Sequence, residues 1–288
     1  MRLIFMFATL LACGASAQTA GRIVSTAPSF TEALFALGAG HRVVAVSQHC
    51  HFPAETAKLP RVGSYLSPNV EAIAKLRPDL VVVHAEQKQA LAQMERIGLR
   101  TLAVRNTSLE DALQSIRTIG AAIGLAEAGV TLQNKLRAQL REIEESAAKQ
   151  TKRRTLLFVV GRTPGRLDGM IAVGKGSFLN EVIRIAGGRN VLDAAPVVYP
   201  RISVEGVLRL DPDVVVDMGD MAVTTGVSED HKRAVVRLWE AQPGVRAATE
   251  RRVFAVAADI FVVPGPRVVE AAREFSRMLY GGGGAPKP

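Results

Sequence analysis

Two histidines flank a cysteine at His49, Cys50 and His51, directly after the apolar segment 42–47. Imidazole and thiolate side chains suit zinc, copper or haem iron. The three residues make an incomplete metal set, because no further H-x-H or C-x-x-C follows them in the chain. We therefore predict no resident metal ion. We take His49 and His51 as candidate contacts to a bound ligand, or to a metal that the ligand carries.

Three further polar residues, His84, Arg162 and Asp259, follow apolar segments that are typical of strands. Ligands of open α/β sheets bind beyond the carboxyl ends of the strands, so these positions favour a role in a binding cleft. The planar guanidinium of Arg162 suits a carboxylate or phosphate oxygen of a ligand. The alternative for all three is an ordinary solvated loop residue.

One pattern occurs twice, starting at residue 70 and again at residue 204, a spacing of 134 residues. Both copies, Val70–Val82 and Val204–Val216, read V-E-x-[IV]-x-x-L-x-P-D-[LV]-V-V. Proline lacks an N–H and restricts the residue before it, so each copy predicts a short helix that ends at the proline. The valine-rich run that follows is typical of a strand buried on both faces of a parallel sheet.

The same spacing relates Tyr65 to Tyr199 and Glu71 to Glu205, although the chain has only three tyrosines. A tyrosine that recurs at the same place in both halves is a candidate for a shared role, with a half-buried core position as the alternative. For the glutamates, the alternative to a functional role is stabilisation of a helix N-terminus through the helix dipole.

A second repeat relates Ser29 to Ser177. Each serine stands where a helix is expected to begin, and its side chain would accept a hydrogen bond from a free N–H of the first turn. The order Ser29, Phe30, Thr31, Glu32 also fits a capping box. Two repeats in the same order predict two lobes of similar structure.

The elements that must position these residues alternate between strand and helix, which predicts parallel sheets with crossover connections. We expect an α/β protein with an N-terminal lobe over 21–124, a C-terminal lobe over 151–280 and the ligand cleft between them. A single long helix over 125–150 joins the lobes, because this stretch lacks proline and is rich in helix formers. The chain shows no flexible Gly/Ser linker, so we expect little movement between the lobes.

The composition and motif content of the chain argue against some classes of function. Hydrophobic residues make up 48% of the chain and charged residues 22%, so it can bury a core without help from disulfides. The net charge is +9, but the basic residues are scattered and only 5% of the residues are aromatic, so we expect no nucleic-acid partner. The chain has no G-x-S-x-G, H-E-x-x-H or Walker A motif, which favours a binding protein over an enzyme.

The two ends of the chain carry signals of their own. Residues 1–17 combine Arg2, a short apolar run and Ala15-Ser16-Ala17, which predicts a signal peptide cleaved after Ala17. A lipid anchor on Cys13 is the alternative. Residues 281–288, GGGGAPKP, predict a disordered tail.

The motifs together resemble the iron-chelate and vitamin B12 periplasmic binding proteins, which are the substrate-binding components of ABC importers. The resemblance rests on R-I-V-S-x-x-P-S-x-T-E, both V-E segments, G-S-F-L-N-E-V-I and P-G-P-R, and it covers residues 22–280. It implies two α/β lobes joined by one long helix, with the ligand in the cleft. It also implies that the protein needs no cofactor of its own.

The resemblance further implies ligand, partners and location. We expect a small metal chelate such as cobalamin, with haem or a ferric siderophore as alternatives and a zinc or manganese ion as a weaker one. Tyr65 and Tyr199 match ligand-contacting positions of the family. Glu71 and Glu205 match the glutamates that engage arginines of the membrane permease, which works with an ATPase. We expect a monomer in the periplasm.

Overall fold

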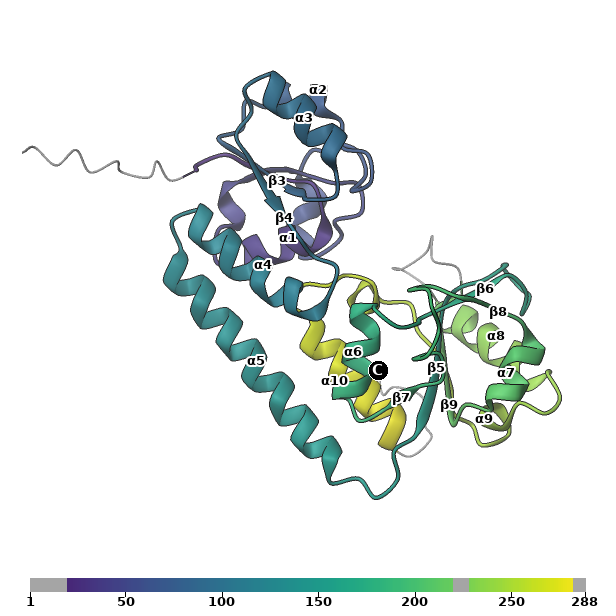
Figure 1. Cartoon of the computed structure of the whole chain (residues 1–288). Helices are drawn as coiled ribbons and strands as arrows, with labels where there is room; N and C mark the ends of the chain where they lie inside the picture. Colours follow the sequence, from purple (N-terminus) through teal and green to yellow (C-terminus); the bar gives the residue numbers. More distant parts are fainter. Residues whose placement is uncertain (1–19, 220–227, 282–288) are drawn as a thin grey trace, which may run out of the picture.

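The computed structural model describes residues 20–219 and 228–281, so the leader with Cys13 and most of the predicted tail lie outside the described residues. Two α/β lobes are joined by the long helix α5 (Ala126–Ala148) (Figure 1). Every helix within the described ranges is too short or too polar to cross a bilayer. The expected two-lobe α/β fold is confirmed.

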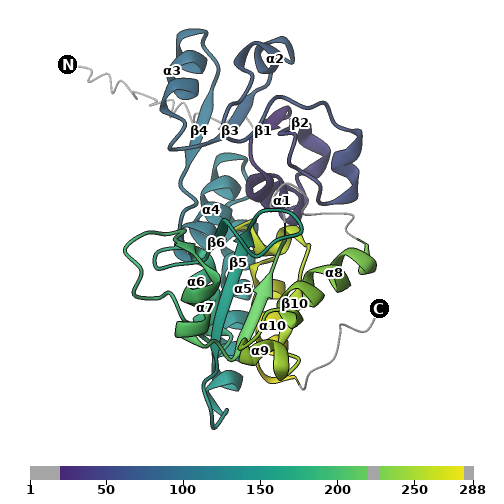
Figure 2. The same ribbon diagram turned by 90° about the vertical axis from the view of Figure 1, so that its right-hand side faces the viewer.

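The N-terminal lobe holds a four-stranded parallel sheet in the order β2-β1-β3-β4, seen side by side at the top of Figure 2. Val81, Val82 and Val83 are fully buried, as expected of a strand covered on both faces. Its elements are β1 (Ile23–Ser25), α1 (Pro28–Ala36), η1 (Gly40–Arg42), β2 (Val43–Val46), η2 (Ala54–Lys58), α2 (Val70–Lys75), β3 (Leu80–His84), α3 (Lys88–Arg96), β4 (Thr101–Val104) and α4 (Leu109–Ala122).

The C-terminal lobe holds a six-stranded sheet in the order β10-β9-β5-β6-β8, with β7 also paired to β5. Its elements are β5 (Thr155–Gly161), β6 (Met170–Ala172), α6 (Phe178–Ile185), β7 (Arg189–Asn190), β8 (Arg201–Ile202), α7 (Val204–Leu210), β9 (Val214–Asp217), α8 (Glu229–Glu240), α9 (Arg246–Thr249), β10 (Val253–Ala255), η3 (Asp259–Phe261) and α10 (Val268–Tyr280).

The sheet of the C-terminal lobe is mixed, because one of its strands departs from the expected parallel arrangement. Strand β6 runs antiparallel to both β5 and β8. The connection from β5 to β6 spans only residues 162–169 and contains no helix. A parallel strand needs a crossover of a dozen or more residues, so a connection this short returns the chain antiparallel.

Helix α5 packs against α4 of the N-terminal lobe and against α6 and α10 of the C-terminal lobe. At about 1.5 Å per residue its 23 residues span roughly 35 Å. Gly129 is buried where α5 meets α4, and a Cβ on it would lie 3.2 Å from the Arg117 Cα. One hydrophobic cluster includes Leu34, Leu140 and Phe275, and so runs through both lobes and the helix between them.

Of the two predicted serine caps, one is confirmed and the other is wrong. Ser177 caps α6, since its side chain accepts a hydrogen bond from the Leu179 N–H. The capping box predicted at Ser29 is absent, because α1 begins at Pro28, which suits the first helical position. Both polar side chains of that predicted box, Ser29 and Glu32, bond instead to residues far away in the chain.

Candidate ligand site

The carboxyl ends of the strands define where a ligand site can form in each lobe. In the N-terminal sheet, β2 lies on one side of β1 and β3 on the other, so the strand order reverses between β1 and β3. Ligands of open α/β sheets bind beyond the carboxyl ends at such a reversal. His84 ends β3 at this point, and its ring packs on the buried Phe30 of α1 at a centroid distance of 5.2 Å.

Tyr65 and His49 lie together on the long segment between β2 and α2. Tyr65 is 40% exposed. Its ring meets the His49 ring edge-on, with the two ring centres 5.8 Å apart. The segment is held in this shape because the Gln48 N–H donates to the Gly63 carbonyl at 2.9 Å. Gly63 has φ +89°, and a Cβ there would lie 2.6 Å from a backbone oxygen, so the position requires glycine.

Two other members of the His49 cluster have different surroundings. His51 is exposed. Cys50 is fully buried beside Thr31 and Ser47, and burial raises the pKa of its thiol, which removes it from ligand chemistry at the surface. No three His, Cys, Asp or Glu side chains within 20–219 and 228–281 gather closely enough to hold a metal ion.

Tyr199 is 48% exposed and lies in the segment that leads into β8. Its hydroxyl is 3.4 Å from the Ser177 hydroxyl at the start of α6. The neighbouring side chains of Val197 and Val198 are also exposed, so this part of the C-terminal lobe presents an apolar surface with one polar group.

Arg162 forms a buried ion pair inside the C-terminal lobe. Its side chain is 2% exposed, and its Nε donates to Asp217 Oδ2 at 2.8 Å. The Trp239 indole N–H donates to the same oxygen at 2.7 Å. This buried group ties β5 to β9 and α8, so we do not retain Arg162 as a ligand contact. No local pattern indicated Asp217 as its partner, because the two residues are 55 positions apart in the chain.

Asp259 lies where the two lobes meet. It pairs with Arg267 at 2.9 Å, and Arg267 also binds Glu32 of α1 through two hydrogen bonds, of 2.5 and 3.1 Å. The Arg267 guanidinium lies 3.9 Å from the centre of the Phe52 ring. Burial raises the pKa of Glu32 to about 7, although its bonds to Arg267 act in the opposite direction. Arg267 therefore joins the lobes at the P-G-P-R segment, a function that the motif alone did not reveal.

Asn106 supplies a second bond between the lobes. Its side-chain amide donates to the Ser29 hydroxyl at 2.7 Å and to the Pro264 carbonyl at 2.9 Å. Glu181 of α6 supplies a third bond between the lobes, since its carboxylate accepts a hydrogen bond of 3.2 Å from the Leu109 N–H. These contacts place the carboxyl ends of β1 and β4 against the loop before α10.

The His84 imidazole has a carboxylate partner that the sequence analysis missed. Its Nδ1 lies 2.6 Å from Glu86 Oε2. Burial raises the pKa of Glu86, but the His84 bond, a backbone hydrogen bond and the charge of Arg105 together leave it below its usual value. The i, i+2 spacing of His84 and Glu86 across the end of a strand is the signal that could have identified this pair.

The two predicted docking glutamates lie in corresponding positions. Glu71 and Glu205 each stand in the first turn of a short helix, α2 or α7, and both are exposed. The helices are capped by Asn69 and Ser203. Hydrogen bonding to Lys75 lowers the pKa of Glu71, and hydrogen bonding to Ser203 lowers that of Glu205, so both are ionised at neutral pH.

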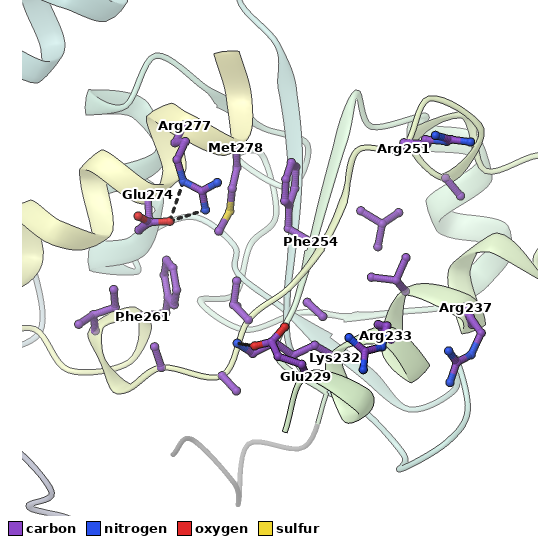
Figure 3. A pocket seen from close by; sticks show the side chains of 18 of the residues that line it. Glu229, Lys232, Arg233, Arg237, Arg251, Phe254, Phe261, Glu274, Arg277 and Met278 are labelled. Atoms are coloured by element: carbon purple, nitrogen blue, oxygen red, sulfur yellow. Dashed lines mark hydrogen bonds and ion pairs between the residues drawn. The ribbon is translucent and has the colours of Figure 1, made fainter. Parts of the chain in front are cut away.

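A hollow of about 900 Å³ lies elsewhere in the C-terminal lobe, between α8, β10 and α10 (Figure 3). Phe254, Phe261 and Met278 contribute to its apolar lining, and Arg237 and Arg251 lie at its rim. None of the ligand or docking residues predicted from the sequence lines it. We therefore build the site from the strand ends and not from this hollow.

Comparison with known proteins identifies the family of this chain. The profile of the family described as "Periplasmic binding protein" matches residues 23–259. The chain is 29% identical over 264 residues to the uncharacterized ABC transporter substrate-binding lipoprotein YvrC of Bacillus subtilis, covering 90% of this chain and 80% of that protein. It is 26% identical to a vitamin B12-binding protein of Vibrio cholerae, covering 90% and 89%.

Solved structures show the same fold. The apo form of the periplasmic heme-binding protein RhuT from Roseiflexus sp. RS-1 has a TM-score of 0.76 and 26% identity, covering 91% of this chain and 99% of that one. The periplasmic vitamin B12-binding protein BtuF of Vibrio cholerae has a TM-score of 0.75 and 26% identity, covering 91% and 97%. This chain belongs to the periplasmic binding protein family, whose members bind ligands for transport and are not enzymes.

Proposed function

We propose that this chain is the extracytoplasmic substrate-binding protein of an ABC importer and that it captures a metal chelate. A corrinoid such as cobalamin is the first candidate, and haem or a ferric siderophore is the alternative. Relatives named for vitamin B12 and heme binding support this class of ligand. The observation that carries the proposal is the pair of half-exposed tyrosines, Tyr65 and Tyr199, one on each lobe.

The two tyrosines suit a flat macrocycle for a physical reason. An aromatic ring on a macrocycle contributes about 0.5–1.5 kcal/mol beyond the area that it buries. Since about 1.4 kcal/mol is tenfold in affinity, two rings contribute up to about a hundredfold. His49 supports the Tyr65 ring from its edge, and Ser177 lies beside the Tyr199 hydroxyl. Asp259 and His51 complete the set of proposed contacts.

The partners and location follow from the same proposal. Glu71 and Glu205 would dock to arginines of a membrane permease, and the permease would work with an ATPase. One exposed carboxylate on each lobe suits a partner with two equivalent halves. The mature chain would begin after Ala17 in the periplasm, or be held at the membrane by Cys13, and act as a monomer.

Calorimetric titration of residues 18–288 with cyanocobalamin, and then with hemin, tests the ligand. We expect one-to-one binding of one of the two, weakened at least about tenfold by Tyr65→Ala. Tyr65→Phe should retain most of the affinity, because it keeps the ring. Ile97→Ala, at an exposed residue that follows α3, is the control. No heat with either compound would leave a ferric siderophore as ligand and remove the argument from stacking tyrosines.

ATPase stimulation of the reconstituted transporter tests the docking. The double variant Glu71→Ala/Glu205→Ala should lose the stimulation while its ligand affinity stays unchanged. Glu127→Ala is a matched control, since Glu127 also lies exposed in the first turn of a helix. Equal loss in the control would mean that the glutamates act only on helix stability.

A further inference from the structure

His84 stands at the one point of the N-terminal sheet where the strand order reverses. It is the last residue of β3, and β3 lies in the interior of the sheet between β1 and β4. Its side chain is 19% exposed, so the ring is largely fixed but open to solvent on part of its surface. Packing on the buried Phe30 ring holds one side of the imidazole in place.

Glu86 fixes which nitrogen of this ring is available. The 2.6 Å contact between His84 Nδ1 and Glu86 Oε2 uses Nδ1 as the hydrogen-bond donor. The neutral ring then carries its lone pair on Nε2. Within residues 20–219 and 228–281, no hydrogen bond to His84 Nε2 is formed. Histidines that ligate a metal commonly donate the second ring N–H to a carboxylate in this way, which sets the tautomer and raises the basicity of the ligating nitrogen.

Two other histidines of the N-terminal lobe lack this arrangement. His49 Nε2 lies 3.1 Å from the Gln48 side-chain amide, so a hydrogen bond already occupies it. His41 bonds through Nδ1 to the Gly38 carbonyl, and a carbonyl brings no charge to the pair. Among the described histidines, His84 is the one whose ring is paired with a carboxylate.

We propose that His84 coordinates the metal of the bound chelate through Nε2, with Glu86 as the residue that positions the ring. The inference rests on the proposed function, since it requires a chelate whose metal has an exchangeable axial position. Coordination replaces a water or other exchangeable ligand on the metal with the imidazole nitrogen. The metal keeps its oxidation state, and the chelate is released unchanged.

The test compares ligands that differ only in whether the metal can accept an imidazole. Hemin has open axial positions, whereas protoporphyrin IX has the same ring and no iron. Aquacobalamin has an exchangeable water, whereas the cyanide of cyanocobalamin blocks that position. Affinities for all four are measured by calorimetry on the mature chain and on His84→Phe, which keeps an aromatic ring against Phe30 but has no nitrogen.

We expect His84→Phe to lower the affinity for hemin or aquacobalamin by at least about tenfold. The affinity for protoporphyrin IX or cyanocobalamin should change by less than about twofold. The visible absorption bands of the metal should shift at the same time. Added imidazole should restore the wild-type spectrum in His84→Ala, where the ring has left a space. Glu86→Gln should lower the affinity for the open-metal ligand by about 10–100-fold, as is typical for loss of such a partner. His41→Ala is the control and should change nothing.

Three outcomes would overturn the inference. Equal losses for open and blocked ligands would mean that His84 acts by packing alone. Unchanged affinities and spectra would mean that it does not touch the metal. In both cases the wild-type chain still binds a chelate, so the proposed function stands. If the wild-type chain bound none of the four, both proposals would fail together for this ligand class.

Discussion

Replacing Arg267 by alanine should lower the free energy of unfolding by about 4 kcal/mol at pH 8. The Glu32 side chain is 3% exposed and would be left without its cation. Removing one partner of a buried ion pair costs about 3–5 kcal/mol. The lost contact between the guanidinium and the Phe52 ring adds about 0.5–1 kcal/mol, while Asp259, at 15% exposure, is partly rehydrated.

The loss should depend on pH in a defined direction. The pKa of Glu32 is raised from 4.5 to about 7 in the folded chain, so between these values the folded state holds a proton that the unfolded state has released. This contribution is fully present below pH 4.5, and it falls away as the pH rises toward 7. A neutral Glu32 needs no cation, so Arg267→Ala should cost less at pH 5 than at pH 8.

Urea unfolding at pH 5 and pH 8, with the midpoint of thermal unfolding alongside, measures the effect. At about 2–4 °C per kcal/mol, the midpoint should fall by roughly 10 °C at pH 8. Arg273→Ala, at an exposed position of α10, the helix that follows Arg267, should change stability by less than about 0.5 kcal/mol. Glu32→Gln in the Arg267→Ala background should recover at least about 1 kcal/mol at pH 8, because it removes the unpaired charge.

A loss below about 1 kcal/mol at pH 8, or one that is the same at both pH values, would refute this reasoning. The small loss would mean that water reaches Glu32 and that the Glu32–Arg267 pair contributes little to joining the lobes. The pH-independent loss would mean that it does not come from an unpaired Glu32 charge.

Three other substitutions test single features of the fold by urea unfolding. Asp217→Ala should lower the free energy of unfolding by about 3–5 kcal/mol, because it leaves the Arg162 guanidinium buried without its carboxylate. A loss below about 1 kcal/mol would show that water replaces the carboxylate. Gly63→Ala should cost about 1–3 kcal/mol more than Gly165→Ala, since both have positive φ but only Gly63 faces a backbone oxygen at 2.6 Å; equal costs would contradict the clash. Ser108→Ala should cost about 1 kcal/mol through the capping box that begins α4, and a neutral result would remove that role.

Local sequence patterns predicted the elements whose formation depends on neighbouring residues. The proline after each V-E segment ends α2 and α7, and the valines that follow form β3 and β9. The long run of helix formers became α5, two residues shorter at its C-terminal end than expected. Ser177 caps α6 because capping depends on the N–H groups of the next turn. Propensity, helix termination and repetition act over a few residues, so a single sequence carries them.

Two polar side chains have partners far away in the chain that local patterns did not indicate. Glu32 was expected to bond within its own helix turn, yet it binds Arg267, which is 235 residues away. Arg162 was expected to meet a ligand, yet it is neutralised by Asp217 from a neighbouring strand. In both cases burial removes water from the charge, and an opposite charge brought near by the fold compensates better than a local hydroxyl or a solvated ligand.

The sequence by itself therefore determined two α/β lobes, their repeat and the long helix between them, together with the candidate tyrosines and glutamates. Only the tertiary structure decided which polar side chains remain available to a ligand. It used Arg162 in an internal ion pair, left Tyr65 and Tyr199 exposed, and gave His84 a carboxylate partner. The physical reason is that burial and charge pairing are properties of the whole packed chain, whereas helix and strand formation are largely local.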